Sequence, residues 1–109
     1  MVTKFDAYEV SIELVRSLAA PIGVIARHDP DLARQLRRAA TSVPLNIAEG
    51  NRRVGRDRLH LFRVADGSAR EVLAGLEAAA AWGYLDPGAV SPAFALADRV
   101  AAMLWRLTH

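Results

Sequence analysis

Apolar residues return every three or four positions in four stretches of the chain, which is the spacing of one face of an α-helix. No segment alternates apolar and polar residues for long enough to predict a β-strand. In the second stretch, at about 100° per residue, one face collects Leu36, Ala39, Ala40, Val43 and Ile47. The pattern predicts four helices, at residues 6–27, 31–51, 56–82 and 91–107.

Proline and glycine residues suggest where these helices begin, bend and end. Pro21 and Pro44 lie inside the first and second helices, and each removes a backbone N–H, so a kink or a break is expected in the first helix near Leu18 to Ala20. Gly50 is suited to ending the second helix. Ser91 and Pro92 have the residue types of an N-cap and a first-turn position, and they predict the start of the fourth helix.

The first helix is expected to turn one apolar stripe toward the core. Glu9, Glu13 and Arg16 lie between the members of this stripe, which suggests a helix with one buried face. The expected inward residues are Phe5, Tyr8, Ile12, Val15, Leu18, Ala19, Ile22 and Ile25.

Four helices joined by short connections favour an all-α fold, an antiparallel up-down-up-down four-helix bundle. A chain of 109 residues has the size of one domain, so residues 1–109 are expected to form a single bundle domain. The sequence has no cysteine, and its start lacks a basic segment followed by a long apolar run. We therefore expect a soluble cytoplasmic protein without a membrane segment.

Positive charge is concentrated in the middle of the chain. The net charge is only +2, yet eight arginines and only two carboxylates, Glu49 and Asp57, lie between positions 34 and 63. Arginine pairs with phosphate oxygens, so this corner between the second and third helices is a candidate site for the RNA or DNA backbone. The candidate contacts are Arg34, Arg37, Arg52, Arg53, Arg56, Arg58 and Arg63. The alternative is a solvated face whose arginines pair with acidic residues of other helices, of another subunit or of a partner protein.

A second, polar stripe runs beside the apolar face of the second helix and continues on the third. The side chains of this stripe can form directional hydrogen bonds. If the second and third helices face each other, Arg38 can pair with Glu71. We interpret the stripe as a structural network between helices or between subunits. The network comprises Gln35, Arg38, Ser42, Asn46, Glu49, Ser68 and Glu71.

The chemistry of an enzyme is not indicated by these residues. Neither Glu49 nor Glu71 has an evident nucleophile beside it, and Ser42 and Ser68 have no histidine nearby in the sequence. The spacing of the histidines and carboxylates does not match a helical-bundle metal site, and no glycine-rich phosphate loop is present. We expect no catalytic residue, no metal and no cofactor.

Three segments together resemble a known family. They are QLRRAATSVPLNIAEG at 35–50, GSAREVLAGL at 67–76 and WGYLD at 82–86. These segments are similar to the bacterial "four helix bundle protein" family, also known from proteins encoded in intervening sequences of large-subunit ribosomal RNA genes. The matching positions are Arg37, Arg38, Ser42, Asn46, Ile47, Ala48, Glu49, Gly50, Gly67, Ser68 and Glu71, whereas Pro44 and Ala69 depart from the usual pattern.

The resemblance implies an antiparallel four-helix bundle that assembles into a ring-like homopentamer, without an established enzymatic activity. A related group resembles it as an accessory protein of diversity-generating retroelements, in which a basic pentamer engages RNA or DNA and a reverse transcriptase. The expected partners are therefore further copies of this chain, RNA or DNA, and a reverse transcriptase or another protein. The leading hypothesis is a non-enzymatic oligomeric scaffold that binds nucleic acid, and the alternative is a purely structural or protein-interaction module.

Overall fold

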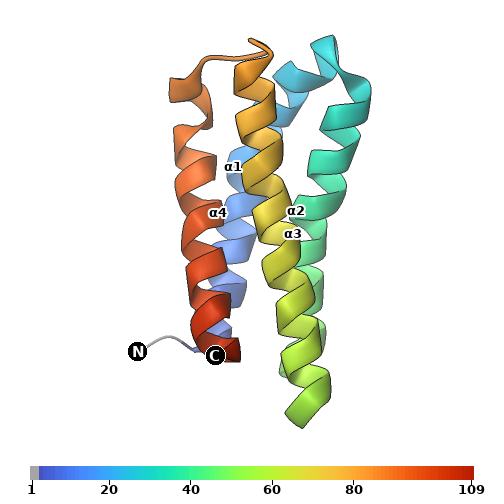
Figure 1. Ribbon diagram of the computed structural model, residues 1–109, viewed down its shortest axis with the longest axis vertical. Coiled ribbons are helices and arrows are strands. Elements are labelled where there is room, and N and C mark those ends of the chain that lie inside the picture. Colours follow the sequence, from blue (N-terminus) through green and yellow to red (C-terminus); the bar gives the residue numbers. More distant parts are fainter. Residues whose placement is uncertain (1–2) are drawn as a thin grey trace.

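The computed structural model describes residues 3–109, which form four helices and no strand. The helices are α1 (Lys4–His28), α2 (Pro30–Asn51), α3 (Gly55–Ala81) and α4 (Pro87–Thr108). Each helix packs against two others, in the pairs α1–α2, α2–α3, α3–α4 and α1–α4. Figure 1 shows the start of α1, the C-terminus and the α2–α3 connection at one end of the molecule, and the other two connections at the opposite end. The predicted all-helical fold of four helices is confirmed.

Local side-chain chemistry starts the first two helices. Thr3 and Asp6 form a capping box, in which each side chain accepts a hydrogen bond from the other residue's backbone N–H. Asp29 caps α2, because its Oδ1 accepts from the backbone N–H of Leu32 at 3.0 Å, and Pro30 takes the first helical position. Such caps bond N–H groups that the helix itself leaves free, so these two starting points are set by the local sequence.

The start of α4 corrects the prediction made from Ser91 and Pro92. The helix begins four residues earlier, at Pro87, with Asp86 in an extended conformation before it. The Ser91 hydroxyl donates to the carbonyl of Pro87 at 3.2 Å, as a residue inside a helix does. Pro92 lies within the second turn, where it removes only one backbone hydrogen bond, the one to Gly88.

The prolines inside α1 and α2 do not interrupt them. Both helices run through Pro21 and Pro44, so of the kink or break predicted for the first helix, the break does not occur. Both proline rings are buried. Burial of these rings and of the apolar faces around them compensates for the lost backbone hydrogen bonds.

The buried stripe of α1 also differs from the predicted one. Phe5 is 67% exposed and Val15 is 36% exposed, whereas Leu14 and Ser11 are completely buried. Ser11 tolerates burial because its hydroxyl donates to the carbonyl of Tyr8 at 2.6 Å. The core residues of α1 are Ala7, Val10, Leu14, Leu18, Ile22 and Ile25.

The apolar face predicted for the second helix is confirmed. Every member of the predicted set is at most 5% exposed: Leu36, Ala39, Ala40, Val43 and Ile47. The buried face was predicted correctly for α2 and incorrectly for α1 because α1 has two adjacent apolar stripes. The single apolar stripe of α2 is flanked by polar residues. None of the helices within residues 3–109 is both long enough and apolar enough to cross a membrane.

Candidate functional site

The α2–α3 connection presents three exposed arginines from a short stretch of chain. Arg52 and Arg53 follow the end of α2, and Arg56 lies in the first turn of α3. We call these three residues the basic loop. Adjacent positions in the sequence place them together, at the end of the molecule where α2 and α3 meet (Figure 1).

One cation of the basic loop is partly neutralised. The Arg53 Nη2 lies 2.7 Å from Glu49 Oε1, and both side chains remain about half exposed to solvent. Their hydrogen bond, reinforced by charge attraction, lowers the pKa of Glu49 and raises the pKa of Arg53. An ion pair this exposed contributes little to stability, so Arg53 is available to exchange Glu49 for a phosphate oxygen.

Arg58 faces the protein rather than the solvent. Its Nε donates to the carbonyl of Gly50 at 3.2 Å, and its Nη2 lies 3.5 Å from the carbonyl oxygen of Asn51. These carbonyls belong to the last turn of α2, where the C=O groups have no N–H partner within the helix. The negative end of the helix dipole also lies there. Arg58 therefore fixes the position of the loop instead of offering its charge to a ligand.

Gly50 lies in the last turn of α2, next to the basic loop, where it packs against α3. A Cβ atom at this position would lie 2.6 Å from Cε1 of Phe62, a fully buried ring. Gly50 does not have the positive φ of a helix-ending glycine, and α2 continues to Asn51. The glycine is required for packing rather than for ending the helix, and the sequence offered no sign of its partner twelve positions further on.

The remaining candidate arginines either lie far along α2 from the basic loop or contact other parts of the chain. Arg34 pairs with Asp31 at 3.1 Å, and the Arg63 guanidinium contacts the carbonyl oxygen of Thr108 at 3.4 Å. Arg37 lines a hollow between α1 and α2. With a rise of about 1.5 Å per residue, Arg37 lies roughly 20 Å along α2 from the loop. The single corner expected from seven arginines is thus reduced to three solvent-facing cations.

The polar stripe forms one direct hydrogen bond between α2 and α3. The Ser68 hydroxyl bonds to the Ser42 hydroxyl at 2.8 Å. The Asn46 side-chain amide donates to both the carbonyl and the hydroxyl oxygen of Ser42 at 2.9 Å. Three of the seven predicted members of the network therefore form a connected, half-buried cluster.

The four other members do not join this cluster. Arg38 and Glu71 are exposed, and neither side chain forms a hydrogen bond or an ion pair within the described residues. The suggested Arg38–Glu71 pair is therefore absent. Glu49 is engaged with Arg53 instead of α3. Gln35, Arg38 and Glu71 line an open groove of about 640 Å³ beside Ser42 and Ser68. In water, an ion pair between Arg38 and Glu71 would gain too little free energy to hold two long side chains in one geometry.

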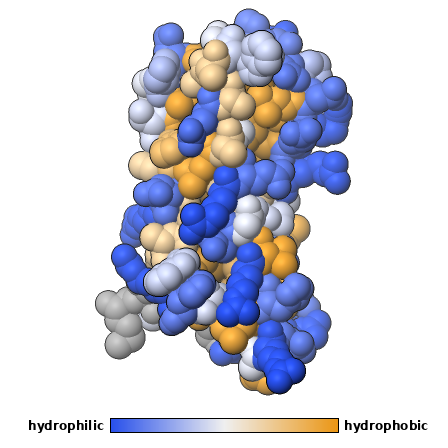
Figure 2. Space-filling view, viewed as in Figure 1, coloured by the Kyte–Doolittle hydropathy of each residue, from blue (hydrophilic) through white to orange (hydrophobic). Residues whose placement is uncertain are grey.

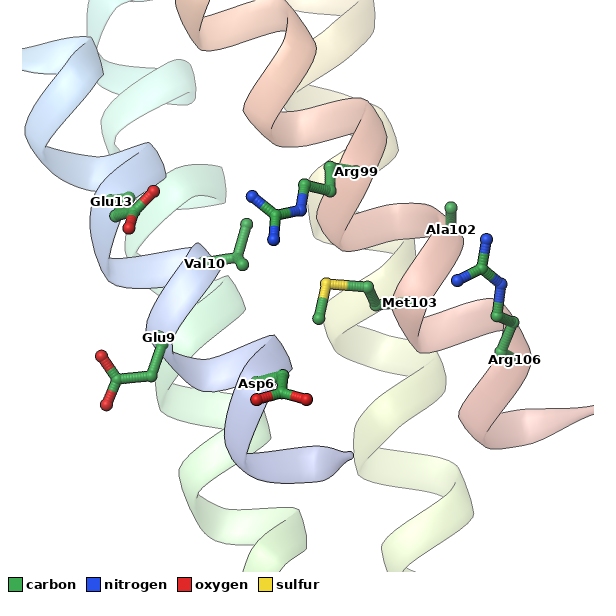
Figure 3. Close-up of a pocket in the computed structure, with 8 residues that line it drawn as sticks. All are labelled: Asp6, Glu9, Val10, Glu13, Arg99, Ala102, Met103 and Arg106. Carbon is green, nitrogen blue, oxygen red and sulfur yellow. The ribbon is translucent and has the colours of Figure 1, made fainter. Parts of the chain in front are cut away.

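A charged cleft that was not predicted from the sequence lies between α1 and α4. Its volume is about 500 Å³, and Figure 3 shows Arg99 extending from α4 toward α1. In residues 3–109, no ion pair joins its carboxylates to its arginines. The lining residues are Asp6, Glu9, Val10, Glu13, Arg99, Ala102, Met103 and Arg106. These residues recur every three or four positions on each helix, which places them on one face of that helix. The sequence did not show that these faces of α1 and α4 lie against each other.

The described residues hold no group of three or more histidine and carboxylate side chains that could bind a metal ion. Ser42 and Ser68 bond to each other and not to a histidine. Neither hydroxyl therefore has the adjacent base that activates a nucleophile.

The comparisons with known proteins agree with the fold described above. Four helices, each packed on two neighbours, define a small all-helical protein. The chain belongs to the 23S rRNA-intervening sequence protein family, whose model matches residues 3–106, and the resemblance found in the sequence is thereby confirmed.

One solved structure from Bacteroides thetaiotaomicron VPI-5482 is described as a protein with unknown function from the S23 ribosomal protein family. It is 17% identical, with a TM-score of 0.85, and the match covers 94% of this chain and 97% of that one. At this identity the likeness concerns the fold. No curated protein matches the chain.

Proposed function

We propose that this protein is a non-enzymatic, oligomeric helical scaffold of the cytoplasm that binds the backbone of RNA or DNA through its basic loop. The observation that carries the proposal is the outward projection of Arg52, Arg53 and Arg56 from one short connection. Only Arg53 of the three has a carboxylate partner in the described residues. Such a compact group of cations attracts phosphates and releases counterions on binding.

In the proposed scaffold, each chain is one domain, an antiparallel up-down-up-down bundle, and five chains assemble as a ring-like homopentamer. The positions of the connections at alternating ends in Figure 1 support the direction of the helices. The pentamer is proposed from the family resemblance. Analytical ultracentrifugation tests it, because a monomer at micromolar concentration contradicts a pentamer.

The fixed backbone beneath the basic loop supports recognition of a backbone ligand. Arg58 holds the last carbonyls of α2, and Gly50 packs directly on Phe62. The loop arginines therefore project from a platform that needs little ordering when a ligand binds, which lowers the entropic cost of association. No aromatic residue lies between positions 52 and 58, so this contact is expected to recognise phosphates and not bases.

A salt series of binding to single-stranded and duplex RNA and DNA tests the proposal. The triple variant Arg52→Ala, Arg53→Ala, Arg56→Ala is compared with Arg70→Ala, Arg99→Ala, Arg106→Ala, which removes the same charge elsewhere. For duplex DNA, we expect the basic-loop variant to bind more weakly and the log–log salt slope to become less steep by about 3. The control should retain most of the slope. Absence of binding at low salt, or equal losses in both variants, would contradict the proposal.

A protein-interaction module is the alternative function, and surface features favour it. Leu45 is 63% exposed on α2, beside the groove that holds the unpaired Arg38 and Glu71. Figure 2 also shows hydrophobic patches among hydrophilic side chains on the face viewed there. The partner would be a neighbouring subunit, a reverse transcriptase or another protein. Under this alternative, the basic-loop variant changes assembly or partner capture, and wild-type protein binds no nucleic acid.

A further inference from the structure

Three aromatic rings stack at the end of the molecule opposite the basic loop. The ring centroids of His28 and Tyr84 are 5.3 Å apart with planes at 9°, and those of Tyr84 and Trp82 are 6.4 Å apart with planes at 15°. His28 ends α1, whereas Trp82 and Tyr84 belong to the α3–α4 connection. The fold thus builds one nearly parallel stack from residues more than fifty positions apart.

The backbone holds two of these rings in fixed positions. Gly83, which lies between them, has a φ of +80°, the left-handed conformation typical of the residue that ends a helix. Its N–H donates to the carbonyl of Ala80, and the N–H of Tyr84 donates to the carbonyl of Ala79, both at 3.0 Å. This pair of bonds closes the C-terminus of α3 and sets Trp82 and Tyr84 on either side of the glycine.

Tyr84 anchors the stack to the body of the protein. Its ring is half-buried against the core, and its hydroxyl donates to Asp29 Oδ2 at 3.2 Å. Trp82, in contrast, is 72% exposed. Because Tyr84 is held by the core and by Asp29, Trp82 is an exposed extension of the stack.

The charges around the stack give no strong attraction for phosphate. Asp29 accepts hydrogen bonds from Leu32 and Tyr84, and Asp31 is paired with Arg34. Arg27 adds one exposed cation and Asp86 one exposed carboxylate. A ligand at this end must therefore gain its affinity from a planar surface rather than from its charge.

We propose that Trp82 is a stacking site for unpaired nucleobases of single-stranded RNA or DNA. This inference rests on the proposed binding of nucleic acid and adds a second contact of different chemistry. Every base has a π-face, so a stacking platform binds single strands with little sequence preference. A base pair inside a duplex has both faces covered by its neighbours, so Trp82 can stack on single-stranded bases but not on the interior of a duplex.

The test uses the full chain carrying Trp105→Phe, which leaves Trp82 as its only tryptophan. Oligoadenylate, oligodeoxyadenylate and a duplex of equal length are titrated at low and at high salt. We expect the single strands to quench Trp82 fluorescence, and the quenching at saturation to remain at high salt. In protein that retains Trp105, Trp82→Ala should weaken single-strand binding by about tenfold and leave duplex binding unchanged.

Trp82→Phe and Trp105→Ala are the matched variants. Phenylalanine keeps a planar ring and should restore part of the lost affinity, and Trp105, which stacks on His109 at the other end of the molecule, should have no effect. Unchanged single-strand affinity in Trp82→Ala, or equal losses for single strands and duplexes, would overturn the inference. Quenching by an oligoarginine peptide but not by oligoadenylate would also overturn it, in favour of a cation-binding surface.

The two proposals fail in distinguishable ways. If only the basic-loop triple weakens binding, the backbone contact stands and the stacking site is wrong. If only Trp82→Ala weakens binding, the stacking site stands and the proposed role of the basic loop is wrong. Circular dichroism and thermal unfolding of each variant show whether a lost affinity reflects a lost fold.

Discussion

The two ends of the molecule are both formed by short connections, yet they expose opposite chemistry. At one end, the basic loop directs Arg52, Arg53 and Arg56 into solvent. At the other end, Trp82 and Tyr84 continue a stack of rings that begins at His28. The first end can attract charge at a distance, whereas the second acts only on a surface that touches it.

The two ends are also held in place by different means. Below the basic loop, the backbone of α2 approaches the ring of Phe62 so closely that only glycine fits at position 50. At the aromatic end, a hydrogen bond from Tyr84 to Asp29 links the α3–α4 connection to the start of α2. An exposed surface can thus be held in place by packing beneath the backbone or by contacts between side chains, and the two respond differently to mutation.

The largest effect on this comparison is expected from Gly50→Ala. The new methyl group would overlap the rigid ring of Phe62, so we expect a loss of about 1–3 kcal/mol in the free energy of unfolding. Chemical denaturation of the matched variant Gly67→Ala provides the control. Gly67 lies exposed within α3 with no neighbouring atom near its Cβ position, so alanine should stabilise by about 0.5–1 kcal/mol.

A second change tests whether the loss comes from this one contact. Adding Phe62→Leu to Gly50→Ala should recover part of the stability that the two single changes lose separately, because leucine leaves room for the methyl group. Simple additivity of the two losses would show that Gly50 and Phe62 are not coupled.

A smaller effect is expected from Tyr84→Phe at the aromatic end. Burial, followed by the hydrogen bond to the Asp29 carboxylate, raises the pKa of Tyr84 above its usual value. The unfolded chain thus loses this proton first as the pH rises above about 10. The stabilisation is complete below the unfolded pKa and is lost as the pH rises through the folded pKa.

Urea denaturation of wild type and Tyr84→Phe at increasing alkaline pH measures this contribution. The wild type should be the more stable protein near neutral pH, by less than the loss caused by Gly50→Ala, and the difference should shrink at alkaline pH. A constant difference across the alkaline range contradicts a role for the hydroxyl proton. Retained Trp82 quenching in the Phe variant would show that the ring, and not the hydroxyl, supports the stack.

The smallest effect is expected from Glu49→Gln in α2, next to the basic loop. The hydrogen bond to Arg53, followed by charge attraction, lowers the pKa of Glu49. The pair therefore stabilises the fold at pH values above the unfolded pKa of about 4.3, and the contribution disappears as the pH falls through the lowered folded value. Because both side chains are well exposed, the change in stability should be close to the limit of measurement.

Nucleic-acid affinity is a more sensitive readout of Glu49→Gln. The substitution removes one negative charge and frees Arg53, so binding at low salt should tighten by a few-fold and become steeper with salt. Asp66→Gln frees Arg70 in the same way at a distance from the loop and is the control. Equal gains in both variants would indicate a general effect of net charge rather than a local site.

The features that depend on near neighbours in the chain could be predicted from the sequence. Four helices followed from apolar spacing because that period belongs to each segment alone. The basic loop could be recognised because its arginines are adjacent in the chain, and the family because its motifs are contiguous. The apolar face of α2 was equally clear, since only one of its sides is apolar.

Tertiary packing decided the features that depend on how helices rotate against one another. It buried the stripe of α1 that contains Ser11 and Leu14, and it joined Ser42 to Ser68 while leaving Arg38 and Glu71 apart. It also brought His28 onto Tyr84. Helical periodicity fixes which residues share a face, but the rotation and register of that face depend on the fit of side chains from distant segments.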